Sequence, residues 1–404
     1  MKAPAAQREA VVAGVAVTEV RIMPGAWLLR IAGLCLWLLA GSAAAAVLPD
    51  DRADALYHAY DGGGVEITGP SLLVLKKIGQ NVALTGNYYV DSVSSASIDV
   101  VTSGASKYSE ERTEFSGGID YLHGNSVMSL SYTNSTENDY DAKTASFGIS
   151  MDMFGNMTTV SLGYAHGWDT VSQNGSPAFS EDIRRDNYRL GISQVITKDM
   201  VLEANYEGIT DEGFLNNPYR VVRYDDGAGG FATQPEVYPR TRTSSALTLR
   251  SKYYLPWDAA AMAEYRFFTD TWDIDAHTLK FGYTHPLTGG WQLEGSVRHY
   301  TQTAADFYSD LFPFFNAQNF LARDKELSTF TSNTLGVKLS YEFIRKGWRA
   351  VDRASFNVAY DMIWFDYDDF RDARFTDPIN VPAGTEPLYD FSAGVLQLYL
   401  SVWF

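Results

Sequence analysis

The sequence predicts a closed antiparallel β-barrel that crosses a membrane, with about sixteen strands, short turns at one end and long loops at the other. Three observations predict it: apolar and polar residues alternate with period two, the connections alternate between short and long, and the chain ends in an amphipathic strand. Because unpaired backbone groups are costly in hydrocarbon, a sheet that spans a bilayer must close on itself.

The composition narrows the class of protein. The 404 residues include 32 Lys and Arg against 49 Asp and Glu, a formal net charge of −17, which argues against nucleic-acid binding. Aromatic residues make up 14% of the chain, which argues against disorder. The mean hydropathy of −0.17 is too low for a bundle of membrane helices. The single cysteine excludes disulfide frameworks and cysteine-based metal sites, and we expect no cofactor.

The first 46 residues have the pattern of an export signal. An apolar run, 31–40, follows Arg30 and is succeeded by small residues up to Ala46. The run is shorter than the roughly 20 apolar residues of a membrane anchor. We therefore expect a cleaved signal peptide over 1–46, with Met23 as an alternative start, and a barrel over 47–404 in a Gram-negative outer membrane. Cys35 would leave with the signal.

The alternation is clear in many segments. In 334–343, Leu335, Val337 and Leu339 alternate with polar residues. The same alternation is present in the segments 82–91, 144–153 and 355–364. A soluble sandwich would turn the apolar face inward, whereas a membrane barrel turns it to lipid around a polar lumen. Alternation alone does not separate the two.

The connections favour the membrane barrel. Short turns are expected at 79–81, 123–125, 154–156, 197–199, 256–258, 285–290 and 345–353. Longer polar stretches lie between them at 92–111, 134–142, 168–184, 210–241, 302–331 and 366–390. This arrangement is typical of short periplasmic turns and long extracellular loops.

Tyrosines recur near both ends of the expected strands. Toward the long loops lie Tyr88, Tyr132, Tyr164, Tyr206, Tyr265 and Tyr360, and toward the short turns lie Tyr121, Tyr253, Tyr283 and Tyr341. Two such rings are expected at the two interfaces of a bilayer, although tyrosine also favours strands in general.

The C-terminal strand carries the most specific local feature. One face of it holds Leu396, Leu398, Leu400, Val402 and the terminal Phe404. This pattern resembles the signal that the bacterial barrel-assembly machinery reads, so we expect that machinery and outer-membrane lipid as partners.

Fifteen segments have the pattern of a strand, but both ends of the barrel chain are expected on the periplasmic side, which requires an even number of strands. The last strand should end in the periplasm, so a sixteenth strand is expected between Asp54 and Gly69, where Val65 and Ile67 alternate with polar residues. Fourteen or eighteen strands remain alternatives. Sixteen strands would enclose an aqueous lumen.

Three blocks carry a family resemblance: 57–64 (YHAYDGGG), 87–114 and 128–144. They resemble a Gram-negative family known only as a domain of unknown function, and the resemblance covers most of the mature chain. It implies an outer-membrane barrel and supplies no catalytic residues.

The polar faces predict a charged lumen. Acidic candidates come from the first half of the barrel: Asp91, Glu114, Asp120, Asp152, Glu203 and Glu207. Basic candidates come from the second half: Arg250, Lys252, Arg266, Lys280, Arg298 and Lys338. One hypothesis is that acidic and basic walls face each other and set a transverse field that orients solutes. The alternative is that the charges pair and brace the wall.

These features favour a pore for passive passage of small polar solutes or ions, without catalysis. One alternative is a barrel whose loop 210–241, with Phe214, Tyr219, Tyr224 and Phe231, docks an envelope partner. Another is an outer-membrane hydrolase built around His166, near Asp169 and Asp182 in sequence, although no motif fixes a nucleophile.

Two further loop features leave alternatives open. The stretch 92–111 would either fold into the lumen as a constriction or lie solvated at the surface. The acidic runs Glu137–Asp141 and Asp366–Asp372 could hold Ca²⁺, but neither has EF-hand spacing, and solvated loops are the better interpretation. We therefore predict no metal site.

Overall fold

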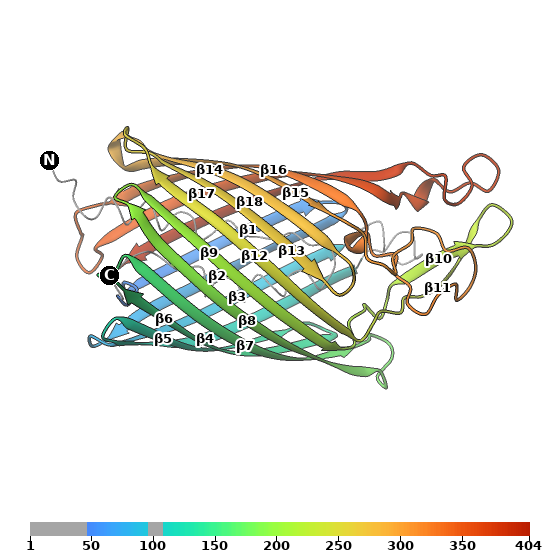
Figure 1. Ribbon diagram of the computed structural model, residues 1–404, viewed down its shortest axis with the longest axis horizontal. Helices are drawn as coiled ribbons and strands as arrows, with labels where there is room; N and C mark the ends of the chain where they lie inside the picture. The colour runs from blue at the N-terminus through green and yellow to red at the C-terminus, as the bar shows by residue number, and fades with distance from the viewer. Residues whose placement is uncertain (1–46, 96–107) are drawn as a thin grey trace.

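The computed structural model describes residues 47–95 and 108–404, and in these residues sixteen antiparallel strands close into one barrel (Figure 1). The first eight strands are β1 Arg52–Gly62, β2 Val65–Ile78, β3 Val82–Ser95, β4 Tyr108–His123, β5 Ser126–Thr136, β6 Tyr140–Met153, β7 Thr158–Ser172 and β8 Ser180–Thr197. The others are β9 Met200–Gly213, β12 Thr241–Tyr254, β13 Ala260–Asp270, β14 Asp275–Pro286, β15 Trp291–Gln302, β16 Phe330–Ile344, β17 Arg353–Arg371 and β18 Leu388–Trp403. The predicted fold class and strand number are confirmed.

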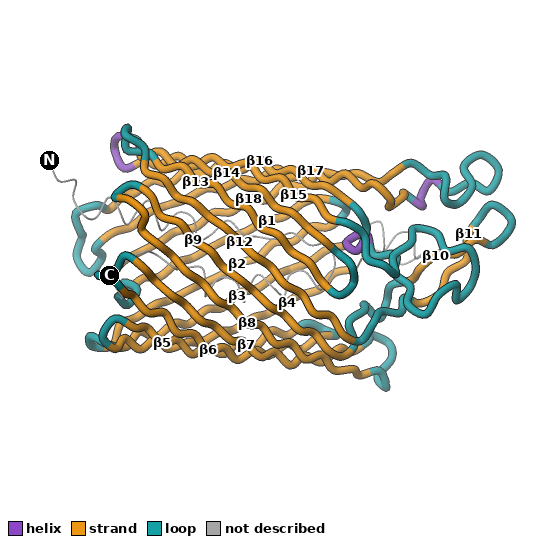
Figure 2. Tube along the Cα trace, in the orientation of Figure 1, coloured by secondary structure: helices purple, strands orange, loops and turns teal. Residues whose placement is uncertain are grey.

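Each strand pairs with its neighbours in chain order, and β1 pairs with β18 to close the ring. The remaining elements are small and lie in the connections (Figure 2): a hairpin of β10 Val221–Asp225 and β11 Phe231–Pro235, and the 3-10 turns η1 Thr288–Gly290, η2 Lys325–Leu327 and η3 Ala373–Phe375. Within the described residues, no helix has the length and apolar character needed to cross a bilayer.

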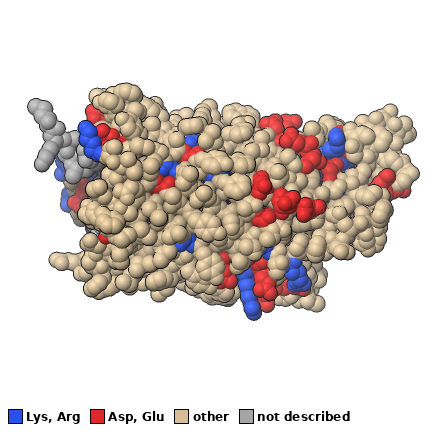
Figure 3. Space-filling view, viewed as in Figure 1, with Lys and Arg blue, Asp and Glu red and all other residues tan. Residues whose placement is uncertain are grey.

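The apolar face of the sheet points outward. Leu130, Leu162 and Leu335 are each at least half exposed, at 56%, 54% and 50%. Exposure on this scale around a whole barrel fits a hydrocarbon surrounding rather than water. On the face seen in Figure 3, uncharged residues cover most of the barrel and acidic side chains gather toward the long-loop end.

The sixteenth strand is displaced from its predicted place. Val65 and Ile67 belong to the outer half of β2, and the additional strand is β1. The two meet at Gly63 and Gly64, whose φ angles of 58° and 79° suit a tight hairpin that only glycine adopts readily.

The displacement has a local cause. Pro70 lies between Ile67 and Leu72, and proline, which lacks a backbone donor, is uncommon inside a strand. In the structure β2 runs through this point, since Gly69 and Pro70 keep their register with β1 while the β3 register is interrupted there.

The strands extend further into the long connections than the sequence predicted. Three predicted loops shrink to 137–139, 173–179 and 372–387, and the connection 271–274 on the same side is short. The middle of the predicted loop 92–111, residues 96–107, lies outside the described residues, as does the predicted signal 1–46.

The last strand lies where its pattern predicted. Leu396, Leu398 and Leu400 alternate with the buried Val395, Gln397 and Tyr399. The Phe404 N–H donates to the Asp51 carbonyl at 3.2 Å, and the Lys76 ammonium lies 4.8 Å from the centre of the Phe404 ring. The end of the chain is thus tied to the start of the barrel, while its role as an assembly signal stays a prediction.

Candidate functional site

A row of charged side chains crosses the lumen wall from β9 to β15. The strand register places Glu203 opposite Arg250, Arg250 opposite Glu264, Glu264 opposite Lys280 and Lys280 opposite Arg298. Directly opposed side chains on one face of a sheet are close enough to interact. The row therefore alternates anions and cations from Glu203 to Lys280 within one wall and ends with two neighbouring cations, Lys280 and Arg298.

Most of these charged side chains form ion pairs with an oppositely charged side chain of another strand. Arg250 donates from Nε to Glu264 at 2.5 Å and lies 3.4 Å from a Glu203 oxygen. Lys252 Nζ contacts the other Glu203 oxygen at 3.0 Å. Elsewhere in the wall Arg266 lies 3.5 Å from Glu207, and Lys338 lies 3.0 Å from Glu294.

The acidic candidates of the first half also have partners. Asp91 is fully buried, accepts from His58 Nε2 at 2.7 Å and lies 3.8 Å from Arg112. Arg112 also pairs with Glu114. Asp120 accepts a 2.6 Å hydrogen bond from Ser129, and Asp152 accepts one of the same length from Thr159.

These contacts bear on the two hypotheses for the lumen. They join strands of the same wall that are adjacent or one strand apart, as expected if the charges brace the barrel, and they leave less unpaired charge for a field between opposite walls. His58 and Arg112 were missed at the sequence level, although the position of Arg112 two residues before Glu114 places both on one face.

Three loops join into one structure over the mouth at the long-loop end of the barrel, which we call the outer mouth, and we call this structure the cap: 214–240, 303–329 and 372–387. Backbone hydrogen bonds connect Val237 with Leu321 at 2.7 and 3.0 Å, Asp225 with Phe312 at 2.9 Å, and Ala383 with Gly229 at 2.9 Å. The hairpin β10–β11 thus forms a shared framework with the other two loops, at the end of the molecule opposite the short turns (Figure 1).

Two apolar clusters fix the cap to the inner side of the strand ends. One joins Leu215, Tyr238, Phe307 and Leu327 to lumen-facing residues of β6, β7 and β8, namely Tyr140, Val171 and Ile183. The other consists of lumen-facing residues of β1, β2, β17 and β18, which include Tyr60, Ile67, Phe365, Phe370 and Tyr389, and the cap joins it through Tyr308.

The two clusters lie on opposite sides of the barrel. Counted around the ring of sixteen, β7 is the seventh strand and β17 the fifteenth. Tyr308, from the middle loop, packs against both clusters. The cap therefore bridges the outer mouth from one wall to the other.

A buried ion-pair network holds the three loops of the cap together, and we call it the keystone. Arg223 donates to Glu386 at 2.5 Å and pairs with Asp310, so one guanidinium connects all three loops. Arg323 binds the same Asp310 at 3.0 Å. Glu386 has no exposed surface and Arg223 is 2% exposed, so the network is shielded from water.

Two carboxylates of the cap have shifted pKa values of opposite direction. Burial raises the pKa of Glu236 to about 7, against the opposing effect of Arg220 and reinforced by Asp324. Burial also acts to raise the pKa of Glu386, but hydrogen bonds from Arg223 and Thr376 outweigh it, and the pKa of Glu386 is lowered.

The aromatic residues considered for docking are engaged within the cap or its edge. Phe214 packs edge-on against Phe179, and Tyr224 packs against Phe315. The Arg223 Cζ atom lies 5.4 Å from the centre of the Phe231 ring. The Tyr219 hydroxyl donates to Asp139 at 2.6 Å. Loop 210–241 therefore uses these side chains to build the cap.

His166 lies away from the lumen. It pairs through Nδ1 with Asp186 at 2.8 Å, and its neighbours on the same outward face are Tyr164 and Trp168. Asp169 instead faces inward and accepts from Tyr140. The partner of His166 is thus neither of the aspartates considered from sequence.

The two acidic runs have different surroundings. Carboxylate oxygens of Glu110, Glu137 and Asp139 lie within 4.8 Å of one another. In the second run, Asp369 accepts from the Thr329 N–H at 2.9 Å and Asp372 from the Arg374 N–H at 3.1 Å. The second run therefore serves backbone structure at the outer end of β17.

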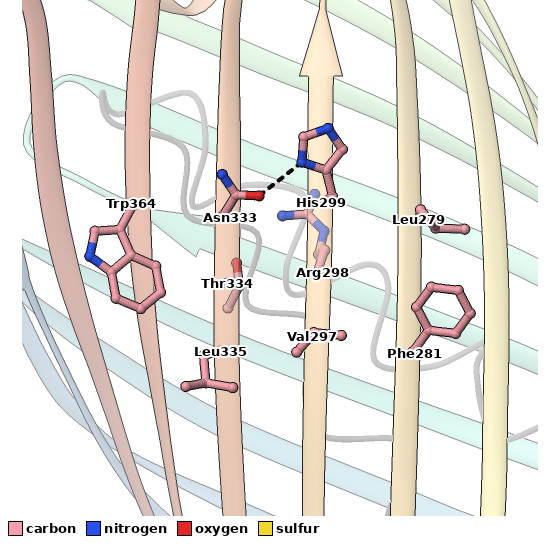
Figure 4. A pocket seen from close by; sticks show the side chains of 9 residues that line it. All are labelled: Leu279, Phe281, Val297, Arg298, His299, Asn333, Thr334, Leu335 and Trp364. Atoms are coloured by element: carbon pink, nitrogen blue, oxygen red, sulfur yellow. Dashed lines mark hydrogen bonds between the residues drawn. The ribbon is translucent and has the colours of Figure 1, made fainter.

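A hollow of about 360 Å³ lies on the outer surface between β14 and β17 (Figure 4). Leu279, Phe281, Val297, Leu335 and Trp364 line it, and at its upper rim His299 Nδ1 lies 2.8 Å from Asn333 Oδ1. His299 is exposed on the outward face.

Comparison with known proteins identifies the family. A family model described as "Protein of unknown function (DUF3570)" matches residues 101–360. The chain belongs to this family. The family resemblance inferred from the sequence is confirmed, and no curated protein matches the chain.

Solved structures similar to this DUF3570 protein are outer-membrane barrels. A bacterial polysaccharide outer membrane secretin is 8% identical with a TM-score of 0.47, covering 88% of this chain and 100% of the other. OccK2 (OpdF) of Pseudomonas aeruginosa is 10% identical with a TM-score of 0.42, covering 88% and 98%. CdiB of Acinetobacter baumannii is 8% identical with a TM-score of 0.45, covering 87% and 60%. At these identities the similarity is one of fold alone.

Proposed function

We propose that this DUF3570 protein is an outer-membrane channel through which small polar solutes or ions diffuse passively. Its short turns would face the periplasm and its cap the outside. The observation that carries the proposal is the charged row from Glu203 to Arg298 on the inner wall of a closed sixteen-strand barrel. A barrel of this size leaves room for water, and charges that line a pore determine what passes through it.

The cap adds a restriction at the outer mouth. Because it is bridged to opposite walls, it narrows the entrance and limits passage to solutes that fit beside it. A docking role has less support, because Phe214, Tyr224 and Phe231 are partly buried in contacts with other residues of the cap and of the neighbouring loop 173–179. A hydrolase has less support, because the pair of His166 and Asp186 lies on the outward face.

Single-channel recording of refolded protein in planar bilayers tests the proposal. We expect stepwise currents whose reversal potential depends on the lumen charges. Folding would be verified by the shift in gel mobility between unheated and heated samples. A folded, membrane-inserted protein that leaves both bilayers and dye-loaded liposomes impermeable to ions and to small sugars would overturn the proposal.

A further inference from the structure

A row of small side chains on the inner wall leaves a hollow among charged residues. The register aligns Gly282 of β14 with Ser296 of β15, and Ser296 with Gly336 of β16. Met262 flanks the row on β13 and Asp361 flanks it on β17. Three adjacent strands thus lack bulk at the same level of the barrel.

Charged residues surround this row on both sides. Two positions nearer the cap, the register places Lys280 beside Arg298. Two positions nearer the short turns, it places Glu294 beside Lys338. The hollow has a volume of about 50 Å³, which is room for a few water molecules.

Asp361 reaches over the floor of the hollow. A Cβ atom on Gly336 would lie 2.2 Å from Asp361 Oδ1 and 2.7 Å from Ser296 Oγ. The absence of a side chain at Gly336 therefore lets a carboxylate and a hydroxyl approach the same point.

The charges of the hollow differ in how they are satisfied. Lys338 is 5% exposed and paired with Glu294. Lys280 and Asp361, in contrast, make no hydrogen bond or ion pair with any residue of the described chain, and both line the hollow. A cation and an anion on opposite sides of a small, partly exposed hollow can each bind a group of the opposite charge on one solute.

We propose that this hollow, which we call the lysine–aspartate subsite, binds small zwitterionic solutes as they pass through the lumen. The solute carboxylate would pair with Lys280, beside Arg298, and the solute ammonium group would donate to Asp361 and Ser296. The subsite deepens the proposed channel function and rests on it for its biological role, although its binding can be measured separately.

Four probes of similar size test the class of ligand: β-alanine, propionate, propylammonium and propionamide. Binding to refolded protein in detergent would be measured by saturation-transfer NMR, and permeation by swelling of proteoliposomes. We expect β-alanine to bind most tightly of the four and to show saturable permeation.

Three substitutions and one control assign the binding to the hollow. Lys280→Gln should weaken β-alanine and propionate binding about tenfold, and Asp361→Asn should do the same for β-alanine and propylammonium, as expected for the loss of one charge-assisted hydrogen bond. Gly336→Ala should weaken binding of all three charged probes by filling the floor. The control is Arg189→Gln, a lumen residue on β8 paired with Glu207 at 3.0 Å, which should change none of them.

The outcomes separate the two proposals. Equal binding of all four probes, or β-alanine binding unchanged in both Lys280→Gln and Asp361→Asn, would overturn the subsite even if the barrel conducts. Selective binding that depends on Lys280 and Asp361 in a barrel that passes no solute would support the subsite and overturn the channel. The gel mobility of each variant shows whether it has folded. If Gly336→Ala does not fold, Lys280→Gln and Asp361→Asn still provide the test, because each should weaken binding of the probe with the opposite charge to the side chain that it replaces.

Discussion

Ion pairs stabilise both the lumen wall and the cap, but the two regions use them differently. In the wall, Arg250 and Glu264 are 14 residues apart and join adjacent strands that backbone hydrogen bonds already hold. In the cap, Arg223 and Glu386 are 163 residues apart and join loops that have little regular structure. We therefore expect wall charges to vary without loss of the fold, and the three loops of the cap to depend more strongly on their ion pairs.

The largest effect is expected for Arg223→Ala. It leaves Glu386 buried without its guanidinium and Asp310 with Arg323 and the Arg371 N–H, and breaking a buried pair in this way costs about 3–5 kcal/mol. We expect the loops 214–240, 303–329 and 372–387 to exchange amide hydrogens much faster while the strands stay protected. Hydrogen-exchange mass spectrometry measures both regions in one sample.

The matched control is Arg240→Ala. Arg240 pairs with Glu181 at the outer rim, where the two side chains are 63% and 36% exposed, and such pairs contribute about 1 kcal/mol or less. Equal loss of protection in the two variants would show that the cap does not depend on its keystone.

The cap should also respond to pH, through Glu236. In the closed cap its pKa is about 7, whereas in an opened loop it returns toward 4.5, so the closed cap holds one more proton between these values. The free energy of closing the cap therefore becomes less favourable as the pH rises from about 4.5 to 7, by up to about 3 kcal/mol. The pKa of Glu386 is lowered in the closed cap, so its ionisation stabilises the closed cap as the pH rises, and this effect is confined to lower pH.

Hydrogen-exchange protection factors of the cap at pH 5.5 and pH 8 measure this dependence. We expect lower protection at pH 8 and a much weaker dependence in Glu236→Gln, since that side chain cannot ionise. Protection that rises with pH in the wild-type cap would contradict the assignment of the effect to Glu236.

The same contrast explains what the sequence could predict. Period-two alternation assigned Glu203, Arg250, Lys280 and Lys338 to the polar face, because the parity of a strand is a local property. It did not pair Arg250 with Glu264, because pairing depends on register between strands. The shift of Val65 and Ile67 into β2 has the same origin, since only pairing with β1 shows that the strand continues through Pro70.

The cap could not be predicted at all. Arg223, Asp310 and Glu386 are ordinary charged residues of three loops, and no period or spacing relates them. The aromatic residues of loop 210–241 could be identified, but the sequence does not distinguish aromatic side chains that dock a partner from those that contact other loops of the same chain. Their contacts arise only after the barrel has brought the loop ends together.

Within the wall, Arg250→Gln should alter selectivity and leave the fold intact. The change leaves the carboxylates of Glu203 and Glu264 with one cation fewer, so the lumen becomes more negative. We expect the preference for K⁺ over Cl⁻ to rise at low salt, because one unit charge about 5 Å from an ion changes the occupancy of that ion roughly fourfold in a water-like dielectric, upward for K⁺ and downward for Cl⁻. Reversal potentials across a salt gradient measure it.

A charge outside the lumen provides the comparison for that experiment. Lys198→Gln removes one positive charge from a short turn, where the side chain is 88% exposed. An equal change in selectivity for both variants would mean that Arg250 acts only through the net charge of the protein, and that the lumen row has no specific role.

The smallest effect is expected at the edge of the cap, for Tyr219→Phe. The Tyr219 hydroxyl donates to Asp139 at 2.6 Å and accepts from the Asn174 N–H at 2.7 Å, so it links the cap to the neighbouring loops 137–139 and 173–179. Because the side chain is 44% exposed, water can replace both contacts, and the loss should be about 1 kcal/mol and confined to these loops. Hydrogen exchange that stays unchanged in 303–329 and 372–387 would show that the keystone holds the cap independently of its edge. Loss of protection across all three cap loops would mean instead that the cap opens cooperatively from this edge, and that Arg223 is not its main support.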